Sequence, residues 1–161
     1  MKVLVISDTH KRLANLEKVL AEEGPFDAVL HCGDVEGDEE RVELMAGCPV
    51  YMVAGNCDYN GANPFDRVVT LEGHKIFMSH GHRYSVGFST DYLARMAKSN
   101  MAELAFYGHL HIPNIENNDG IIVASPGSLS EPRQAGRKPS YIIMQLEPGK
   151  TPNLEYMYLE K

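Results

Sequence analysis

Cysteine is scarce in this chain of 161 residues, which has only Cys32, Cys48 and Cys57. An odd number of unevenly spaced cysteines, with no Cys-x-x-Cys pair, argues against a disulfide framework and a structural zinc knuckle. Long hydrophobic runs are also lacking. The apolar start, residues 3–6, is too short for a signal-peptide core and is followed at once by Asp8, His10 and Lys11. We therefore expect reduced thiols, a cytoplasmic location and no membrane span.

Clusters of basic residues are missing as well, because no run of Lys or Arg exceeds two residues and the formal net charge is -7. Proteins that bind nucleic acid through a broad surface need such clusters, so these features argue against a nucleic-acid partner. Fixed-period repeats and low-complexity tracts are absent too. A hydrophobic fraction of 43% with 23% charged residues is typical of a folded globular protein. With no linker-like stretch, we predict one domain over residues 1–161.

The first third of the sequence alternates between strand and helix patterns. Residues 2–7 are rich in Val and Ile and predict a buried central strand, whereas the apolar residues at positions 13, 16, 19 and 20 recur at helical spacing. A second strand and helix are predicted at 28–31 and 39–46, and a third strand at 50–53. Such alternation predicts neighbouring parallel strands joined by helices.

After residue 56 the pattern changes to hairpins. Residues 67–71 and 75–79 flank Glu72-Gly73-His74 as the strands of a hairpin would. One more helix is predicted at 90–99, with Ser89 or Thr90 as its cap. Further strands are predicted at 105–107, 121–124, 141–146 and 154–159, with turns at 117–120 and 147–149. The fold class is therefore α/β, with either two packed sheets or one large mixed sheet and helices outside.

Metal-ligand side chains follow five of these strands, namely Asp8, His10, Asp34, Asn56, His80, His109 and His111. Asp8 and His10, two residues apart after a strand, can bind one ion together, and His109 and His111 repeat this arrangement. Neutral imidazoles suit Mn, Fe, Zn, Co or Ni, and carboxylates add affinity for Mn and Mg. The mixed nitrogen and oxygen set therefore favours a transition metal.

A carboxylate can bridge two ions, and we assign that role to Asp34, because Gly33 before it allows the backbone to turn without a Cβ clash. Asn56 would add a neutral oxygen ligand. Two ions roughly 3.5 to 4 Å apart lower the pKa of a shared water and clamp both reacting oxygens of an in-line displacement. This chemistry suits hydrolysis of a phosphate ester.

The order of these motifs resembles that of the calcineurin-like metallophosphoesterases, whose pattern is Asp-x-His, Gly-Asp, Gly-Asn-His-Asp/Glu, His and Gly-His-x-His. Within that superfamily the chain is similar to the small YfcE-like phosphodiesterases, which have Gly-Asn-Cys-Asp and end in Pro-Gly-Ser followed by Pro-Arg. The corresponding residues here are Gly55 to Asp58, Pro126-Gly127-Ser128 and Pro132-Arg133.

The resemblance implies a four-layer α/β/β/α sandwich with mixed sheets and helices outside. It implies that one ion is held by Asp8, His10, Asp34 and His111, and the other by Asp34, Asn56, His80 and His109. It also implies in-line attack by a hydroxide that bridges two divalent ions, which are Mn or a related ion such as Ni, Co, Zn or Fe, with Asp34, Asn56 and His80 as catalytic residues. The implied substrate is a small phosphodiester.

Cys57 departs from the superfamily pattern, which has histidine at this position as a proton donor to the leaving group or a ligand of the phosphoryl oxygen. A neutral thiol donates a proton poorly. Loss of a general acid costs roughly 10² to 10⁴ in rate, and least when the leaving group is already good. We therefore predict that activated aryl phosphodiesters are hydrolysed better than alkyl phosphomonoesters.

Other polar residues allow two interpretations, a role at the site and a structural role. Cys57, Asp58, His82 and Arg133 are candidates for contact with substrate. Asp58 can instead orient a metal-binding loop, and His82 and Arg133 can be ordinary loop residues. His31 and His74 are interpreted as structural, at a strand end and in a hairpin turn.

Two other functions are less consistent with the sequence. A retromer coat subunit shares the implied fold and serves mainly as a scaffold, which is the alternative to an enzyme, although a pure scaffold has no need of seven competent ligands. A nuclease is disfavoured by the net charge and by the lack of basic or aromatic stripes. A homodimer is the expected assembly.

Overall fold

The computed structural model describes residues 1–59 and 61–160. Along the chain its elements are β1 (Lys2–Ile6), α1 (Ala14–Glu23), β2 (Ala28–His31), α2 (Glu39–Ala46), β3 (Val50–Met52), β4 (Asp66–Leu71), β5 (His74–Ser79), α3 (Asp91–Ser99), β6 (Leu104–Phe106), β7 (Pro113–Asn118), β8 (Ile121–Pro126), β9 (Ser140–Gln145) and β10 (Asn153–Tyr158).

The strands form two five-stranded mixed sheets. The first has the order β10-β9-β1-β2-β3, in which β1, β2 and β3 are parallel and β9 pairs antiparallel with both β1 and β10. The second has the order β4-β5-β6-β8-β7, in which β5, β6 and β8 are parallel and the two edge strands are antiparallel. The predicted parallel arrangement of the first three strands is confirmed.

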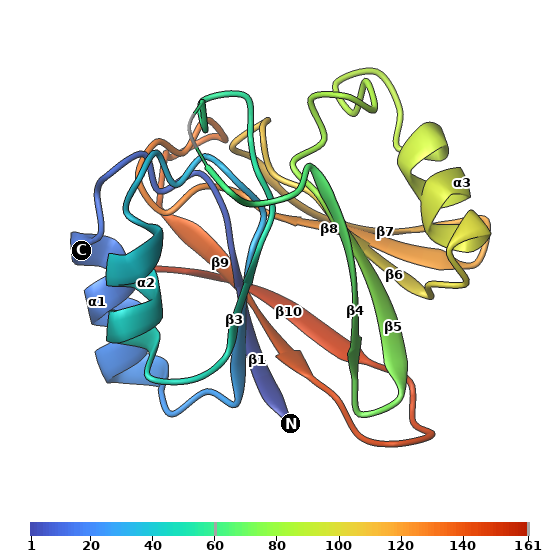
Figure 1. Cartoon of the computed structure of the whole chain (residues 1–161), viewed down its shortest axis with the longest axis horizontal. Coiled ribbons are helices and arrows are strands. Elements are labelled where there is room, and N and C mark those ends of the chain that lie inside the picture. Colours follow the sequence, from blue (N-terminus) through green and yellow to red (C-terminus); the bar gives the residue numbers. More distant parts are fainter. Residues whose placement is uncertain (60, 161) are drawn as a thin grey trace.

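The two sheets face each other, with α1 and α2 outside the first and α3 outside the second (Figure 1). Because successive side chains of a strand point to opposite faces, β1 contributes to two apolar layers. Val3 and Val5 pack with Phe106 of the second sheet, whereas Leu4 and Ile6 face the helices. A third apolar cluster joins α3 to the second sheet. The expected four-layer α/β/β/α sandwich is confirmed.

Strand β7 is absent from the sequence-based prediction. It begins with Pro113 and is otherwise largely polar, so it has no apolar alternation, and proline is tolerated because β7 is an edge strand. The turn predicted at 117–120 is shorter in the structure, since Asn117 and Asn118 still pair with β8. Asp119 and Gly120, with φ of 51° and 83°, make the connection.

The N-cap of α3 is one of the two predicted residues, but its side chain makes no capping hydrogen bond. Thr90 occupies the N-cap position, but its hydroxyl donates to Glu116 on β7 instead of capping the helix. The Ser89 hydroxyl accepts a hydrogen bond from the Asp91 amide at 3.1 Å. The helix start is therefore tied to both its own first turn and the edge strand.

His74 lies in β5 and not in the hairpin turn, which is formed by Glu72 and Gly73 with positive φ. Its buried ring approaches the Glu103 carboxylate, with 2.6 Å between Nδ1 and Oε1, and the Glu147 carbonyl, with 2.9 Å between Nε2 and O. Glu147 follows β9, so this histidine joins the two sheets. The hydrogen bond to Glu147, with the charges of Glu103 and Glu72, raises the pKa of His74 against the effect of burial.

Within the described ranges, no helix is both long and apolar enough to cross a membrane.

The His74 contacts predict a pH-dependent contribution to stability. A histidine whose pKa is raised by folding stabilises the protein fully below its unfolded pKa of about 6.5, and this contribution is lost as pH rises through the folded pKa. We expect His74→Ala to lower the urea midpoint more at about pH 5.5 than at about pH 9. Glu103→Gln should show the same trend. An equal loss at both pH values would assign the effect of His74 to packing alone.

Candidate metal centre

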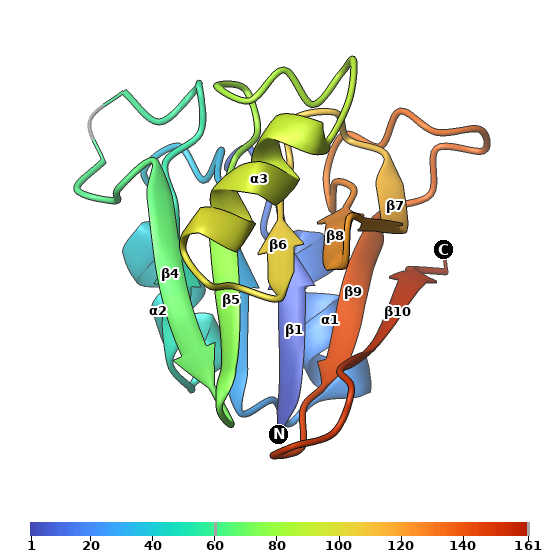
Figure 2. The same ribbon diagram turned by 90° about the vertical axis from the view of Figure 1, so that its right-hand side faces the viewer.

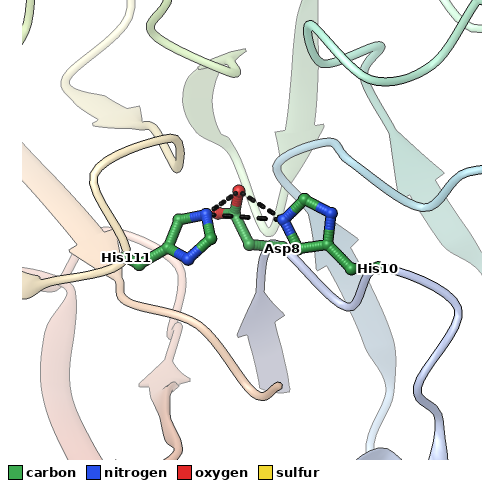
Figure 3. A group of neighbouring side chains, drawn as sticks. All are labelled: Asp8, His10 and His111. Atoms are coloured by element: carbon green, nitrogen blue, oxygen red, sulfur yellow. Dashed lines mark hydrogen bonds and ion pairs between the residues drawn. The ribbon is translucent and has the colours of Figure 1, made fainter. Parts of the chain in front are cut away.

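The predicted ligands converge at the end of the molecule where the parallel strands finish, on the loops at the top of Figure 2. Ligand atoms of Asp8, His10 and His111 all lie within 4.8 Å of one another. Figure 3 shows the two histidine rings on either side of the Asp8 carboxylate. Asp8, Asp34 and His80 form a second group of the same kind. Two adjoining groups of metal-ligand atoms are thus present, and they share Asp8.

In the first group, Asp8 Oδ1 lies 3.1 Å from His111 Nε2 and 3.7 Å from His10 Nε2. The two histidine Nε2 atoms are 3.4 Å apart. Three donor atoms therefore face one small volume.

The second group is extended by Asn56 and His109. Asn56 Oδ1 lies 3.0 Å from both His80 Nε2 and His109 Nδ1. Asp34 Oδ2 is 3.2 Å from His80 Nε2 and 3.8 Å from His10 Nε2, so one carboxylate oxygen faces a histidine of each group. All seven predicted ligands lie at this centre.

The backbone of the ligand loops is strained. Asp8, His10, Asp34, His109 and His111 all have positive φ, between 45° and 69°. Residues other than glycine adopt this left-handed conformation at an energetic cost, and such residues cluster at functional sites. The surrounding structure must therefore hold these side chains in place.

Backbone hydrogen bonds hold the loops together. The Asp8 amide donates to the Gly33 carbonyl and the His10 amide to the Asp34 carbonyl, each at 3.0 Å. The hydroxyl groups of Ser128 and Ser130 both donate to the Asp8 carbonyl at 2.8 Å. The first ligand loop is therefore bonded on both sides.

Close approach of the backbone requires glycine at two positions. A Cβ on Gly55 would lie 2.0 Å from Asp34 Oδ1, and one on Gly108 would lie 1.9 Å from Ser7 Oγ. Gly33, with φ of 99°, makes the turn expected before Asp34.

Three of the candidate ligand histidines have a hydrogen-bond partner at Nδ1, on the side of the ring away from the centre. Nδ1 of His80 donates to the Cys32 carbonyl and Nδ1 of His111 to the Glu131 carbonyl, each at 2.7 Å. Nδ1 of His10 lies 2.6 Å from Glu36 Oε1. Such contacts place the proton on Nδ1 and direct the lone pair of Nε2 into the centre.

Glu36 is a site residue that the sequence analysis did not identify. Its position two residues after Asp34 was the only available signal. Glu36 also has positive φ. A carboxylate oxygen of Glu36 and ligand atoms of His10 and Cys57 all lie within 4.8 Å of one another.

Asp58 binds the backbone of the ligand loops. Its Oδ2 accepts hydrogen bonds from the amides of Asp34 and Gly55 at 2.8 and 2.7 Å, and its Oδ1 accepts one from the Glu36 amide at 2.7 Å. Three amides use both carboxylate oxygens. This geometry favours the orienting role of Asp58 over contact with substrate.

The carboxylates and histidines shift one another's pKa. Burial acts to raise the pKa of both Asp8 and Asp34. His111 and His80 nevertheless lower the pKa of Asp8, and His80 lowers the pKa of Asp34. Burial acts to lower the pKa of His80 and His111, yet Asp34 and Asp8 raise it. The carboxylates are therefore ionised and ready to bind a cation.

The remaining candidates lie around this centre. The Cys57 amide donates to Asp34 Oδ1 at 2.8 Å, and burial, together with Asp34, raises the pKa of its thiol to about 11. His82 lies beside His80 and His109, with ring centroids 5.4 and 6.1 Å away. The Arg133 amide donates to the His111 carbonyl, while its side chain is exposed.

His31 has the structural role that was expected. It ends β2, is fully buried, and contacts Thr9 Oγ1 at 3.1 Å and the Gly33 amide at 3.2 Å. Burial lowers the pKa of His31 to about 4, so the ring is neutral.

The donor set fits divalent transition-metal ions. Asp8 Oδ1 is buried and accepts no hydrogen bond from the described residues, which is costly for a charged oxygen unless a cation faces it. Imidazole nitrogens and carboxylate oxygens in one site suit Mn, Fe, Co, Ni or Zn.

Comparison with known proteins gives a consistent result. Residues 1–149 match the model of the calcineurin-like phosphoesterase superfamily domain. The probable metallophosphoesterase YsnB of Bacillus subtilis is 32% identical over 148 residues, covering 91% of this chain and 85% of that protein. The phosphodiesterase YfcE of Escherichia coli is 30% identical over 167 residues, covering 88% and 85%.

Solved structures share the architecture. A predicted phosphoesterase from Streptococcus pneumoniae superposes with a TM-score of 0.84 at 28% identity, covering 98% of this chain and 88% of that one. Vacuolar Protein Sorting 29 from Cryptosporidium parvum superposes with a TM-score of 0.78 at 21% identity, covering 99% and 98%. At that identity the second similarity shows the fold alone.

The contact between Glu36 and His10 predicts a role in metal affinity. Removing a carboxylate behind a ligand histidine typically costs 10- to 100-fold in affinity. We expect Glu36→Ala to weaken Mn²⁺ binding by about that factor in calorimetric titration, and Glu36→Gln, which keeps an acceptor, to weaken it less. The matched control is Glu40→Ala, an exposed position on α2. Equal affinities for Glu36→Ala and the control would show that Glu36 does not support His10.

Proposed function

Since this chain belongs to the calcineurin-like phosphoesterase superfamily and resembles its small YfcE-like members, we propose that it is a phosphodiesterase that uses two divalent metal ions. The observation that carries this proposal is the pair of adjoining ligand groups that share the buried Asp8. Two ions can occupy such a pair of groups together, whereas one group alone would suit only a single ion.

The proposed ligand sets start from the two groups but differ at one point, because Asp34 instead of Asp8 is proposed as the residue shared by both ions. Asp8, His10 and His111 would hold one ion, and Asn56, His80 and His109 would hold the other. Asp34 would serve both ions, because its Oδ2 faces both His10 and His80. When bound, the two ions would supply an activated water and neutralise charge on the phosphoryl group.

The chain's own residues position these groups. Asp58 holds the amide of the bridging Asp34, and Glu36 holds the ring of His10. Burial of Asp8 and Asp34 keeps water from competing for their charges, which strengthens their interaction with any cation. The preformed geometry reduces the reorganisation needed during reaction.

Cys57 occupies the place beside the site where a proton donor is expected. A thiol with a pKa near 11 holds its proton at neutral pH and releases it poorly. The protein would therefore depend on substrates whose leaving group needs no protonation. This supports aryl and other activated diesters over alkyl monoesters.

A scaffold with the fold of a retromer subunit is the alternative. Its support is the structural similarity to Vacuolar Protein Sorting 29, which shows fold only. The strained backbone of five ligand residues favours the enzyme, because strain of this kind has no use in a passive surface.

Several finer features belong to the same proposal. We propose Mn as the metal used, a small phosphodiester as substrate, no nucleic-acid partner, a homodimer, and one catalytic domain over residues 1–161. The cytoplasmic location stays a prediction from the sequence.

The first test is metal-dependent hydrolysis of bis-p-nitrophenyl phosphate. Metal-stripped protein should be inactive, and Mn²⁺ should restore activity, with Ni²⁺, Co²⁺, Zn²⁺ and Mg²⁺ compared in parallel. His109→Ala should abolish the activity while leaving the circular dichroism spectrum unchanged. Arg95→Gln, on the exposed side of α3, is the matched control. Folded protein with no activity for any ion would favour the scaffold.

The second test concerns the leaving group. We expect kcat/KM for bis-p-nitrophenyl phosphate to exceed that for an alkyl phosphomonoester such as glycerol phosphate by at least about 10², the lower end of the contribution of a general acid. Cys57→His should narrow this gap by improving the alkyl substrate. A wild-type preference for alkyl monoesters would contradict the role assigned to Cys57.

A further inference from the structure

A pocket with three arginines lies beside the first ligand group. It has a volume of about 540 Å³ and is lined by Arg12, Ser130, Glu131, Pro132, Arg133 and Arg137. We call it the arginine pocket. No part of the metal centre needs these arginine side chains, so their gathering requires another explanation.

The arginine pocket is built from the same loops that hold the metal ligands. Arg12 follows His10 by two residues, and the Arg133 amide donates to the His111 carbonyl at 3.0 Å. Ser130 donates to the Asp8 carbonyl at 2.8 Å. Because consecutive Cα atoms are about 3.8 Å apart, a group in this pocket lies on the order of 10 Å from the centre.

The charge of the pocket is positive in a protein whose net charge is -7. Its one carboxylate, Glu131, lies 3.4 Å from Arg12. Among the described residues, no carboxylate lies within ion-pair distance of Arg133 or Arg137. Two guanidinium groups are thus free to bind an anion.

The opposite side of the centre has the reverse charge. A groove of about 910 Å³ beside Cys57 and Asp58 is lined by five acidic residues, Glu36, Glu39, Glu40, Glu43 and Asp58, and by only Lys11 and Arg41 as basic ones. Arg41 is already paired with Asp38 at 3.0 Å. A second anionic group on the substrate would be repelled from this groove and attracted to the arginine pocket.

We propose that the arginine pocket binds a terminal phosphate carried by one alcohol of the phosphodiester substrate. This inference rests on the proposed function and names its substrate class: diesters with a second phosphate a few bonds from the one that is cleaved. Guanidinium groups bind phosphate oxygens through two parallel hydrogen bonds, and several of them suit a dianionic phosphate better than a single carboxylate.

The test compares two substrates that differ only in this group. They are the p-nitrophenyl ester of thymidine 5′-phosphate and the same ester with a 3′-phosphate. In both, the oxygen of water forms a bond to phosphorus, the bond to p-nitrophenolate breaks, and the proton of water passes to solvent. With Mn²⁺-loaded protein we expect KM for the 3′-phosphorylated ester to be about tenfold lower, a difference typical of charge-assisted contacts.

Substitutions locate the effect. Arg137→Gln, and the pair Arg133→Gln with Arg137→Gln, should bring the KM ratio of the two esters close to one. Arg95→Gln should keep the wild-type ratio. Thymidine 3′,5′-bisphosphate and thymidine 5′-phosphate carry no p-nitrophenyl ester, so their binding can be measured by calorimetry. The wild type should bind the bisphosphate more tightly, and the arginine variants should lose this preference. In about 1 M salt, where the Debye length is about 3 Å, the preference should shrink.

The outcomes separate the two proposals. Hydrolysis of neither ester with any metal would overturn the proposed function. Hydrolysis of both with equal KM in the wild type, or an unchanged ratio in the arginine variants, would overturn the arginine pocket alone. A larger effect of Arg95→Gln than of Arg137→Gln would also overturn it, by assigning the preference to general surface charge.

Discussion

The burial of two aspartates side by side is the constraint on which the rest of the site depends. Asp8 is fully buried and Asp34 is 2% exposed, and both are held in the charged form. Charges removed from water are costly unless opposite charges or hydrogen-bond donors compensate for them. The histidines around them, and a cation when one is present, provide that compensation. The strong local demand explains why so many neighbouring groups are aimed at these two side chains.

Compensation of these buried charges constrains the backbone conformation as well as the side chains. Five ligand residues adopt positive φ, and Gly55 and Gly108 leave no room for a Cβ beside the carboxylates. Packing of the apolar core between the two sheets offsets the energetic cost of this strain, because it fixes the positions of the strand ends. The hydrogen bonds of Asp58 and Ser128 then tie each loop to the next.

The distribution of charge around the centre connects this architecture to function. One side of the site is acidic and the other carries the arginine pocket. An anionic substrate group would therefore be repelled from the first side and attracted to the second. Cys57 lies on the acidic side, and its thiol keeps its proton at neutral pH. The proposed chemistry therefore depends on the leaving group of the substrate, and the proposed specificity depends on its second phosphate.

Much of this protein could be read from the sequence. Strongly apolar strands such as β1, and helix α1 with its apolar residues at helical spacing, follow from local periodicity, and the seven candidate ligands follow from their residue types and their places after strands. Strand β7 could not be predicted, since an edge strand that begins with Pro113 has no apolar alternation. Glu36, the position of His74 in β5, and the arginine pocket depend on contacts between segments far apart in the chain. The sequence alone determined which residues can bind metal, because that is a property of each side chain, whereas only the tertiary structure decided what surrounds them, because distance and burial arise when the two sheets pack.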